Sequence, residues 1–215
     1  QDGVGVKRIR FTSGHPSGCS AELARAMAEF PAVCEHLHLP LQSGSDRILR
    51  RMRRGYTLAD YRQAMARMRA ARTGIAITTD IIVGFPGETD TDFQQTREFM
   101  EEMGFDGAFI FKYSPRPGTL AAAWNDDVPA DEKMLRNKLL LGDQERRTLR
   151  INHALIGQTI EVLSEGPSRR NAERWSGRTR TNKIVVFHNP GWIIRGDFVR
   201  VVIRQVHAQS MIGEA

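Results

Sequence analysis

Three loops of the chain place glycine or proline and polar side chains directly after an apolar run, the combination from which ligand sites are built. They span residues 37–46 (LHLPLQSGSD), 79–89 (TDIIVGFPGET) and 109–119 (FIFKYSPRPGT). Their amide, hydroxyl, carboxyl and guanidinium groups could bind a polar small molecule, and their glycines allow close approach of the backbone. If the apolar runs are parallel strands, all three loops leave the sheet at one edge. The sequence therefore predicts a ligand-binding rim.

The apolar runs are typical of strands buried on both faces. Residues 81–83 form a continuous β-branched run without alternation, and residues 37–41 and 109–111 are similar but shorter. Residues 8–12 (RIRFT) predict a further strand ahead of these three.

Helical patterns fill the intervals between the predicted strands. Thr57 and Thr89, each followed three residues later by Asp, predict helix starts, and Gly74 and Gly104 predict helix ends. Residues 20–30 predict another helix. The apolar positions at helical spacing are Leu58, Tyr61, Met65 and Met68, then Phe93, Phe99, Met100 and Met103.

This alternation predicts βα units, which build either an open doubly wound sheet or a (β/α) barrel. A full eight-unit barrel takes about 250 residues. The pattern here ends near Gly118, so only part of such a barrel is expected. Because the chain starts at Gln1 and almost at once enters a predicted strand, we also expect that N-terminal sequence is missing.

The pattern changes at Asp126. A long helical segment starts at residues 128–131 (VPAD) and runs to about Leu155. Predicted short strands follow at residues 159–163, 183–187 and 198–206, as in a small barrel of the oligonucleotide-binding kind. The expected parts are therefore residues 1–125, a linking helix at 126–155, and a small all-β domain at 156–215.

The small domain carries most of the net charge of +6. Residues 151–215 hold nine Arg and Lys against five Asp and Glu, a net of +4. Cations beside a stacking indole favour RNA as the partner, whereas a basic loop that only promotes solubility is the alternative. The predicted RNA-binding residues are Arg169, Arg170, Arg174, Trp175, Arg178, Arg180 and Lys183.

The composition, 40% hydrophobic and 26% charged, predicts a cytoplasmic globular protein, with neither a membrane span nor a signal peptide. Cys19 and Cys34 are too few for a disulfide framework or an iron–sulfur site. We interpret them as buried apolar groups and expect no metal site. A mixed site with His15, His36 and His38 is the alternative.

Five segments, in order, resemble the radical S-adenosylmethionine methylthiotransferases: residues 8–16 (RIRFTSGHP), 39–46 (LPLQSGSD), 50–57 (RRMRRGYT), 79–89 (TDIIVGFPGET) and 113–119 (YSPRPGT). Residues 177–187 (GRTRTNKIVVF) resemble the TRAM domain of the tRNA-modifying, MiaB-type branch. The resemblance implies an α/β fold: the C-terminal part of a radical SAM (β/α) partial barrel, followed by a small OB-like TRAM domain.

The resemblance also implies an activity, the transfer of a methylthio group to C2 of an isopentenylated adenosine beside the tRNA anticodon. It implies S-adenosylmethionine and two [4Fe–4S] clusters as cofactors, with an electron donor and a sulfur source as partners. The Cys-x-x-x-Cys-x-x-Cys loop that holds the radical cluster in this family is absent, as is the other cluster domain. We therefore expect this chain to be the C-terminal half of such an enzyme and to be inactive by itself. Catalytic residues and the oligomeric state stay unassigned.

By resemblance, S-adenosylmethionine lies at the strand-end loops, with Gln42, Ser43, Asp80, Gly84, Glu88, Tyr113, Ser114 and Arg116 as its binding residues. Asp80 replaces the first glycine of the family's fifth-strand pattern, and Glu88 falls one residue late, so Glu88 could equally favour a helix start. A turn that caps the following helix is the alternative for Gln42 and Ser43, and a surface salt bridge is the alternative for Arg116. The basic run at residues 47–54 is either a solvated helix face or a tRNA contact.

Two further interpretations stay open. The ribosomal-protein branch of the family modifies an aspartate side chain and also ends in a TRAM domain, although residues 178–183 (RTRTNK) fit the tRNA branch better. The chain could also serve only as an RNA-binding module, with the partial barrel as a passive platform.

Overall fold

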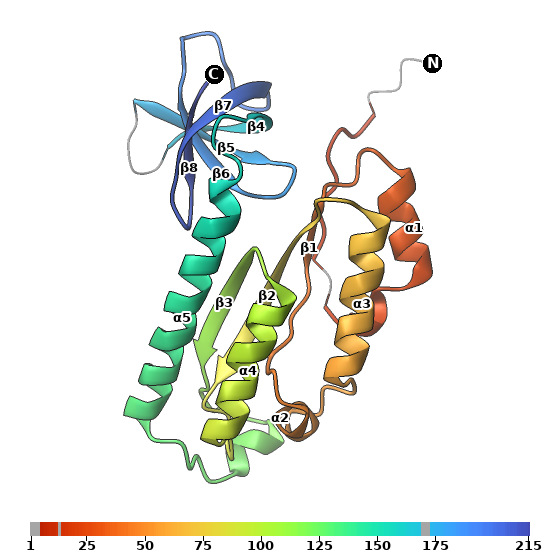
Figure 1. The fold of residues 1–215 in the computed structure, drawn as a ribbon, viewed down its shortest axis with the longest axis vertical. Helices are drawn as coiled ribbons and strands as arrows, with labels where there is room; N and C mark the ends of the chain where they lie inside the picture. Colours follow the sequence, from red (N-terminus) through yellow and green to blue (C-terminus); the bar gives the residue numbers. More distant parts are fainter. Residues whose placement is uncertain (1–4, 13, 169–172) are drawn as a thin grey trace. The chain divides into compact units, whose positions relative to one another are not determined.

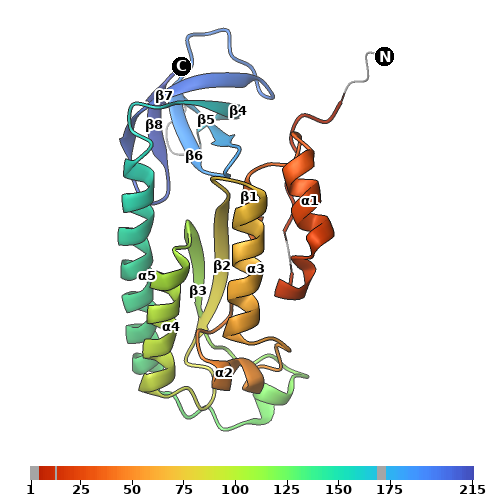
Figure 2. The same ribbon diagram turned by 45° about the vertical axis from the view of Figure 1, so that its right-hand side comes forward.

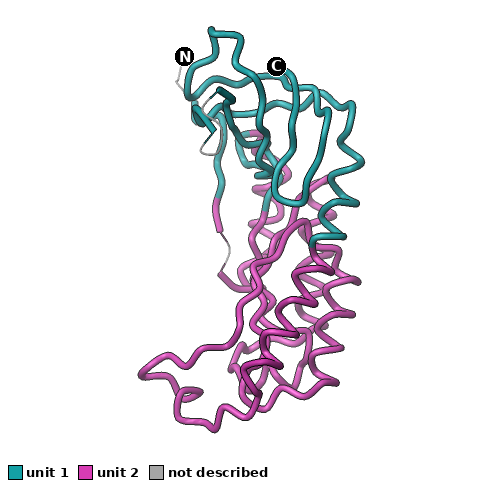
Figure 3. Tube along the Cα trace, turned by 90° about the vertical axis from the view of Figure 1, so that its left-hand side faces the viewer, with its two compact units in different colours: residues 1–10, 32–36, 145–215 teal, residues 11–31, 37–144 magenta. Residues whose placement is uncertain are grey.

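The computed structural model describes residues 5–12, 14–168 and 173–215. By contacts in space the chain forms two units, shown in teal and magenta in Figure 3. Unit 1 contains residues 1–10, 32–36 and 145–215, and unit 2 contains residues 11–31 and 37–144. The predicted boundaries at 125/126 and 155/156 divide the chain into continuous stretches of sequence, whereas each unit combines separate stretches. These boundaries stay predictions.

Unit 2 is built on a three-stranded sheet in the order β1-β2-β3 (Figure 1). The strands are β1 (His36–His38), β2 (Ala76–Val83) and β3 (Gly107–Lys112), and β2 pairs in parallel with β3. Gln42 continues the pairing beside β2 through a parallel bridge to Ile81. The strand predicted at 37–41 ends at His38 because Pro40 has no N–H to donate to a ladder.

Helices α3 (Leu58–Ala71) and α4 (Asp90–Met103) lie on one face of this sheet (Figure 2). Each starts with a capping box, Thr57 with Asp60 and Thr89 with Asp92, which confirms both predicted starts. The other helical segments of unit 2 are η1 (Pro16–Gly18), α1 (Ala21–Glu29), α2 (Asp46–Arg51) and η2 (Leu120–Ala123).

The prediction of a strand at residues 8–12 is wrong. Among the described residues of this segment, Ile9 forms an isolated parallel bridge to Val33 and no ladder. The neighbouring Arg8 and Arg10 instead donate to main-chain carbonyls, of Arg178 (2.7 Å) and Thr179 (2.5 Å) respectively. Main-chain pairing with residues 32–34 is limited to Ile9, whose N–H donates to Ala32 O (2.7 Å) and whose carbonyl accepts from Cys34 N–H (3.0 Å).

The strands of unit 1 form a closed barrel in the order β4-β5-β6-β8-β7. They are β4 (Thr159–Pro167), β5 (Arg174–Thr179), β6 (Ile184–His188), β7 (Phe198–Val206) and β8 (Met211–Glu214). Val162, Val185, Phe187 and Val201 are among the side chains that fill its core. The three strands predicted here are confirmed. The other two, β5 and β8, were not predicted, because RWSGRT and MIGE are short and contain glycine.

Helix α5 (Ala130–His153) is the predicted long helix, and it runs from unit 2 into unit 1. Within unit 2, Asn137 Nδ2 donates to Ile110 O of β3 (2.8 Å) and Gln144 Nε2 donates to Phe105 O (2.9 Å). Among the described residues, α5 and the other helices are too short or too polar to cross a bilayer.

Candidate functional site

The strand-end loops of unit 2 surround a cavity of about 690 Å³, within the size range of small-molecule sites. Five of the eight predicted cofactor-binding residues line this cavity: Gln42, Asp80, Tyr113, Ser114 and Arg116. The sequence-based expectation of a rim at one sheet edge therefore agrees with the geometry. Contact of these residues with a cofactor stays a prediction.

Two residues of the cavity wall have left-handed backbone, which is uncommon for side chains other than glycine. Gln42 has a φ of 70° and Arg53 a φ of 55°. Gln42 is held there by main-chain hydrogen bonds on both sides, from its N–H to Asp80 O (2.8 Å) and from Ile82 N–H to its carbonyl (2.9 Å). Strained backbone of this kind is concentrated at functional sites.

Asp80 lies on the sheet face opposite α3 and α4, because alternate residues of β2 point to opposite faces. Its Oδ2 atom is 3.3 Å from Nε2 of His38, and Nδ1 of the same ring is 2.9 Å from Thr78 Oγ1. His38 was predicted as an ordinary polar residue or a metal ligand. In the structure it orients the one carboxylate of the cavity wall.

Aromatic rings form another part of the wall. Phe85 packs edge-on against Tyr113 and Trp124, with ring centroids 5.1 and 5.9 Å apart, and the Arg51 guanidinium lies 4.7 Å from the Trp124 ring centroid. No sequence pattern pointed to Trp124, because it lies beyond the strand-end motif and returns to the cavity only through η2. The Tyr113 hydroxyl and Arg54 Nε are buried without a hydrogen-bond partner in the described part of the chain.

Ser43, Gly84 and Glu88, the other three predicted residues, are not among the residues that line the cavity. Ser43 is fully buried, and its hydroxyl accepts from Ser45 N–H (3.2 Å). Gly84, with a φ of 68°, donates its N–H to Glu88 Oε1 (2.9 Å). The Glu88 carboxylate thus links the end of the loop after β2 back to its first residue, Gly84.

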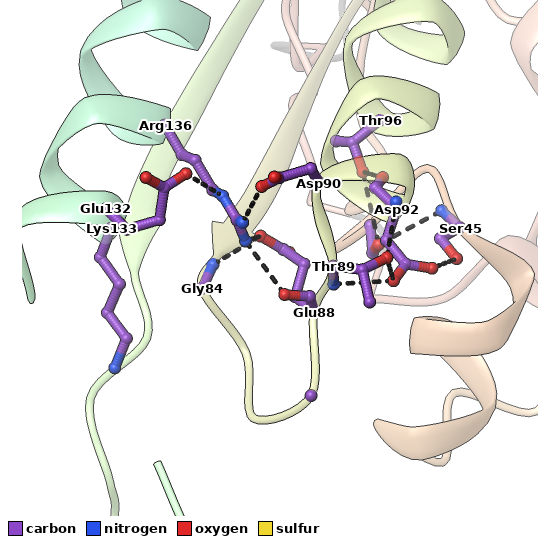
Figure 4. Close-up of polar contacts among 12 residues, drawn as sticks. Ser45, Gly84, Glu88, Thr89, Asp90, Asp92, Thr96, Glu132, Lys133 and Arg136 are labelled. Carbon is purple, nitrogen blue, oxygen red and sulfur yellow. Dashed lines mark hydrogen bonds and ion pairs between the residues drawn. The ribbon is translucent and has the colours of Figure 1, made fainter. Parts of the chain in front are cut away.

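A buried ion pair holds the same loop against α5 (Figure 4). Arg136 Nη1 is 2.8 Å from Glu88 Oε1, and both side chains are at most 5% exposed. The Arg136 guanidinium also contacts Glu132 (2.8 Å) and Asp90 (2.6 Å). Burial raises the pKa of Glu88, and hydrogen bonds from Gly84 and Arg136 oppose that rise only in part.

Asp92, in the first turn of α4, is a second buried carboxylate (Figure 4). It accepts from Ser45 Oγ (2.6 Å), from the Thr89 N–H and hydroxyl (2.9 and 2.6 Å), and from Arg47. Burial alone would raise the pKa of Asp92, but these donors lower it well below its usual range. This network joins the loops after β1 and β2, and Arg47 of the basic run is therefore part of it.

The chain offers no cage for an iron–sulfur cluster. Its only two cysteines, Cys19 and Cys34, are both buried, whereas a [4Fe–4S] cluster needs three or four thiolates. No group of three metal-ligating side chains occurs within residues 5–12, 14–168 and 173–215.

The predicted RNA-binding residues do not form one cluster. Arg169 and Arg170 lie outside the described residues. Arg174 is exposed at the start of β5, opposite His188, and Trp175 packs against the barrel core. Arg178 lies near the other end of β5, and Arg180 and Lys183 lie in the turn that follows it.

Two of these arginines have partners within unit 1. Arg180 forms a two-pronged ion pair with Glu35 (2.6 and 3.0 Å), which raises the pKa of this arginine. Arg178 donates to the Asn182 side chain (3.2 Å) and lies 3.5 Å from Glu165. RNA contact by either arginine would have to compete with these partners, and it stays a prediction.

Comparison with known proteins gives two domain matches. The model of the radical SAM superfamily matches residues 4–100, and that of the TRAM domain matches residues 153–215. The proteins named tRNA-2-methylthio-N(6)-dimethylallyladenosine synthase from Methylacidiphilum infernorum and Ralstonia pickettii are 46% and 43% identical over 97% and 98% of this chain. The chain belongs to the radical SAM methylthiotransferase family.

The predicted fold of a radical SAM methylthiotransferase, part of a (β/α) barrel followed by a TRAM domain, is confirmed. The chain spans about half the length of the curated relatives it matches, 44% of each of those two proteins. Coproporphyrinogen III oxidase from Escherichia coli, a radical SAM enzyme of known structure, is 11% identical over 68% of this chain and 41% of that chain. Its TM-score of 0.46 is too low to support an argument.

Proposed function

We propose that this chain is part of a tRNA methylthiotransferase that modifies C2 of an isopentenylated adenosine beside the anticodon. The observation that carries the proposal is the 46% identity, over 97% of the chain, to a relative named for that product. A basic small barrel and a cavity of small-molecule size in the other unit support it, because the reaction requires an RNA substrate and a small-molecule methyl donor.

We further propose that the cavity holds S-adenosylmethionine. The group fits the observations because the cavity has the size of a ligand site and includes buried polar atoms without a partner. When bound, S-adenosylmethionine supplies a methyl group and a source of organic radicals. The Asp80 carboxylate can accept hydrogen bonds from a hydroxyl or an amine, and the Arg116 guanidinium can pair with a carboxylate. The rings of Phe85, Tyr113 and Trp124 exclude water from that part of the wall.

The remaining cofactors and partners lie outside the residues of this chain. We propose that both [4Fe–4S] clusters are held by other sequence, since two buried cysteines cannot supply their ligands. The proposed partners are tRNA, an electron donor and a sulfur source, in the cytoplasm. For Ser43, Gly84 and Glu88, the contacts support a role in fixing the loops rather than direct binding.

Replacing Asp80 by Ala should weaken binding of S-adenosylmethionine by about tenfold, the loss of one charge-assisted hydrogen bond. Isothermal titration of the 215-residue chain measures this. Asp131→Ala, the same change at an exposed position of α5, is the control and should bind as the wild type does. Equal affinity of the Asp80 variant and this control would remove Asp80 from the site.

The chain alone should not cleave S-adenosylmethionine after reconstitution with iron and sulfide, because it lacks cluster ligands.

A chimaera in which this chain replaces the matching 209 residues of the M. infernorum relative should restore the methylthio group to tRNA in cells that lack the modification. Mass spectrometry of tRNA nucleosides reports the product. A chimaera that modifies a ribosomal protein and leaves tRNA unchanged would assign the chain to the other branch of the family.

A further inference from the structure

The loop that joins β6 to β7 (Figure 2) contains Trp192, an exposed tryptophan of the barrel. Trp192 is 66% exposed and Ile194 is 65% exposed, whereas Ile193 between them is 2% exposed and belongs to the barrel core. Trp175, the tryptophan singled out by sequence, packs against that core instead. The loop thus anchors itself by one side chain and presents the two flanking ones to solvent.

The backbone of this loop is fixed by hydrogen bonds from its own side chains. Asn189 Oδ1 accepts from the N–H groups of Gly191 (2.9 Å) and Ile193 (3.1 Å), and Asn189 Nδ2 donates to Ile193 O (2.8 Å). Asp197 Oδ2 accepts from Ile194 N–H (2.9 Å). The end of the loop is bound to β4, where Gly196 N–H donates to Ser164 O (2.9 Å). A ligand would therefore meet Trp192 already held in place, without the entropy cost of ordering a loop.

The charges next to the loop suit a polyanion. Arg195 is exposed on the loop itself, and Arg174 is exposed opposite His188, the residue after which the loop begins. At the other end, Lys7 Nζ lies 5.4 Å from the ring centroid of Phe198. Acidic residues also lie near the loop: Asp197, whose carboxylate caps the loop backbone, Glu173 beside Arg174, and Glu165 next to Ser164 of β4. Residues 151–215 keep a net charge of +4.

We propose that Trp192 is a stacking platform for an unpaired base of the RNA, with Arg195 and Arg174 placed to meet the adjoining phosphates. A flat indole in a basic setting binds single-stranded nucleic acid, because every base has a face to stack and every link carries a charge. This inference rests on the proposed function only in taking RNA as the partner. It moves the RNA contact of the barrel from the Arg178–Lys183 end of β5 to the opposite end.

The test is the affinity of the 215-residue chain for a fluorescently labelled single-stranded RNA that contains 2-aminopurine. Trp192→Ala should bind about tenfold more weakly and lose the quenching of 2-aminopurine, and Trp192→Phe should retain most of both. The salt dependence of the affinity should stay unchanged, because the substitution removes no charge. Phe30→Ala, an exposed aromatic of unit 2, is the matched control and should bind normally.

Each outcome bears on a different statement. If the wild type binds RNA and Trp192→Ala binds it equally well, the stacking role is wrong and the proposed function is untouched. If Trp192→Ala instead converts a dimer of the chain to a monomer, the loop contacts a second copy and the RNA role is also wrong. If the wild type binds no RNA at all, both the inference and the RNA partner of the proposed function fail.

Discussion

Replacing Arg136 by Met should destabilise unit 2 by about 3–5 kcal/mol, because the Glu88 carboxylate would stay buried without its partner. Methionine fills much of the volume of the arginine side chain. The loss of stability would therefore come from the unpaired Glu88 charge and not from a cavity. Urea unfolding followed by the circular dichroism of the helices measures the change.

The pH dependence of the free energy of unfolding tests whether the unpaired Glu88 carboxylate causes this loss of stability. The pKa of Glu88 is already raised by burial, and loss of the guanidinium would raise it further. The folded variant would then bind a proton at a higher pH than its unfolded chain, so its stability should recover as the pH falls through the raised folded pKa of Glu88 toward the unfolded pKa of a glutamate. A loss independent of pH would argue against a buried, unpaired Glu88.

Two variants serve as controls for this prediction. Lys138→Met makes the same kind of change at an exposed position of α5 and should alter stability by at most about 0.5 kcal/mol. In the double variant of Glu88→Gln and Arg136→Met neither charge of this pair remains, so part of the stability should return. Equal stability of the Arg136 and Lys138 variants would show that the pair does not hold the loop.

The sequence predicted the parts of this fold that depend on local signals. Buried strand β2 and the starts of α3 and α4 follow from a β-branched run and from capping boxes, which act within a few residues. Residues 8–12 have a similar strand-like local pattern, but their structure depends on contacts with distant parts of the chain. Arg8 and Arg10 bind carbonyls about 170 residues away in the sequence, which no local pattern encodes.

In the candidate site, too, local sequence patterns predicted some positions, whereas positions that depend on distant contacts were missed. The strand-end loops bring Gln42, Asp80 and Tyr113 around one cavity, because parallel strands bring such loops together, and the binding role of these residues stays a prediction. His38 and Trp124 were not predicted there, since their positions depend on side-chain pairing and on the return of η2. Glu88 resembled a ligand by its place in a motif, yet its carboxylate is used by Gly84 and Arg136.

The second large effect is expected at Asp92, which joins α4 to the loop after β1. Replacing it by Asn should cost about 2–3 kcal/mol near neutral pH, because the hydrogen bonds from Ser45 and Arg47 lose their charged acceptor. Thermal or urea unfolding of the 215-residue chain measures the loss. Asp60→Asn is the matched control, since Asp60 completes the same capping box on α3 without the bonds to Ser45 and Arg47.

The dependence on pH gives this prediction its sharpest test. The pKa of Asp92 is lower in the folded chain than in the unfolded one, so its stabilisation is complete above the unfolded value of about 3.9 and is lost as the pH falls toward the folded value. The wild type should therefore lose stability in acid faster than the Asn variant, and the two curves should converge. Parallel curves would mean that the carboxylate acts through packing alone. In that case the charge network would not be what fixes the two loops beside the cavity.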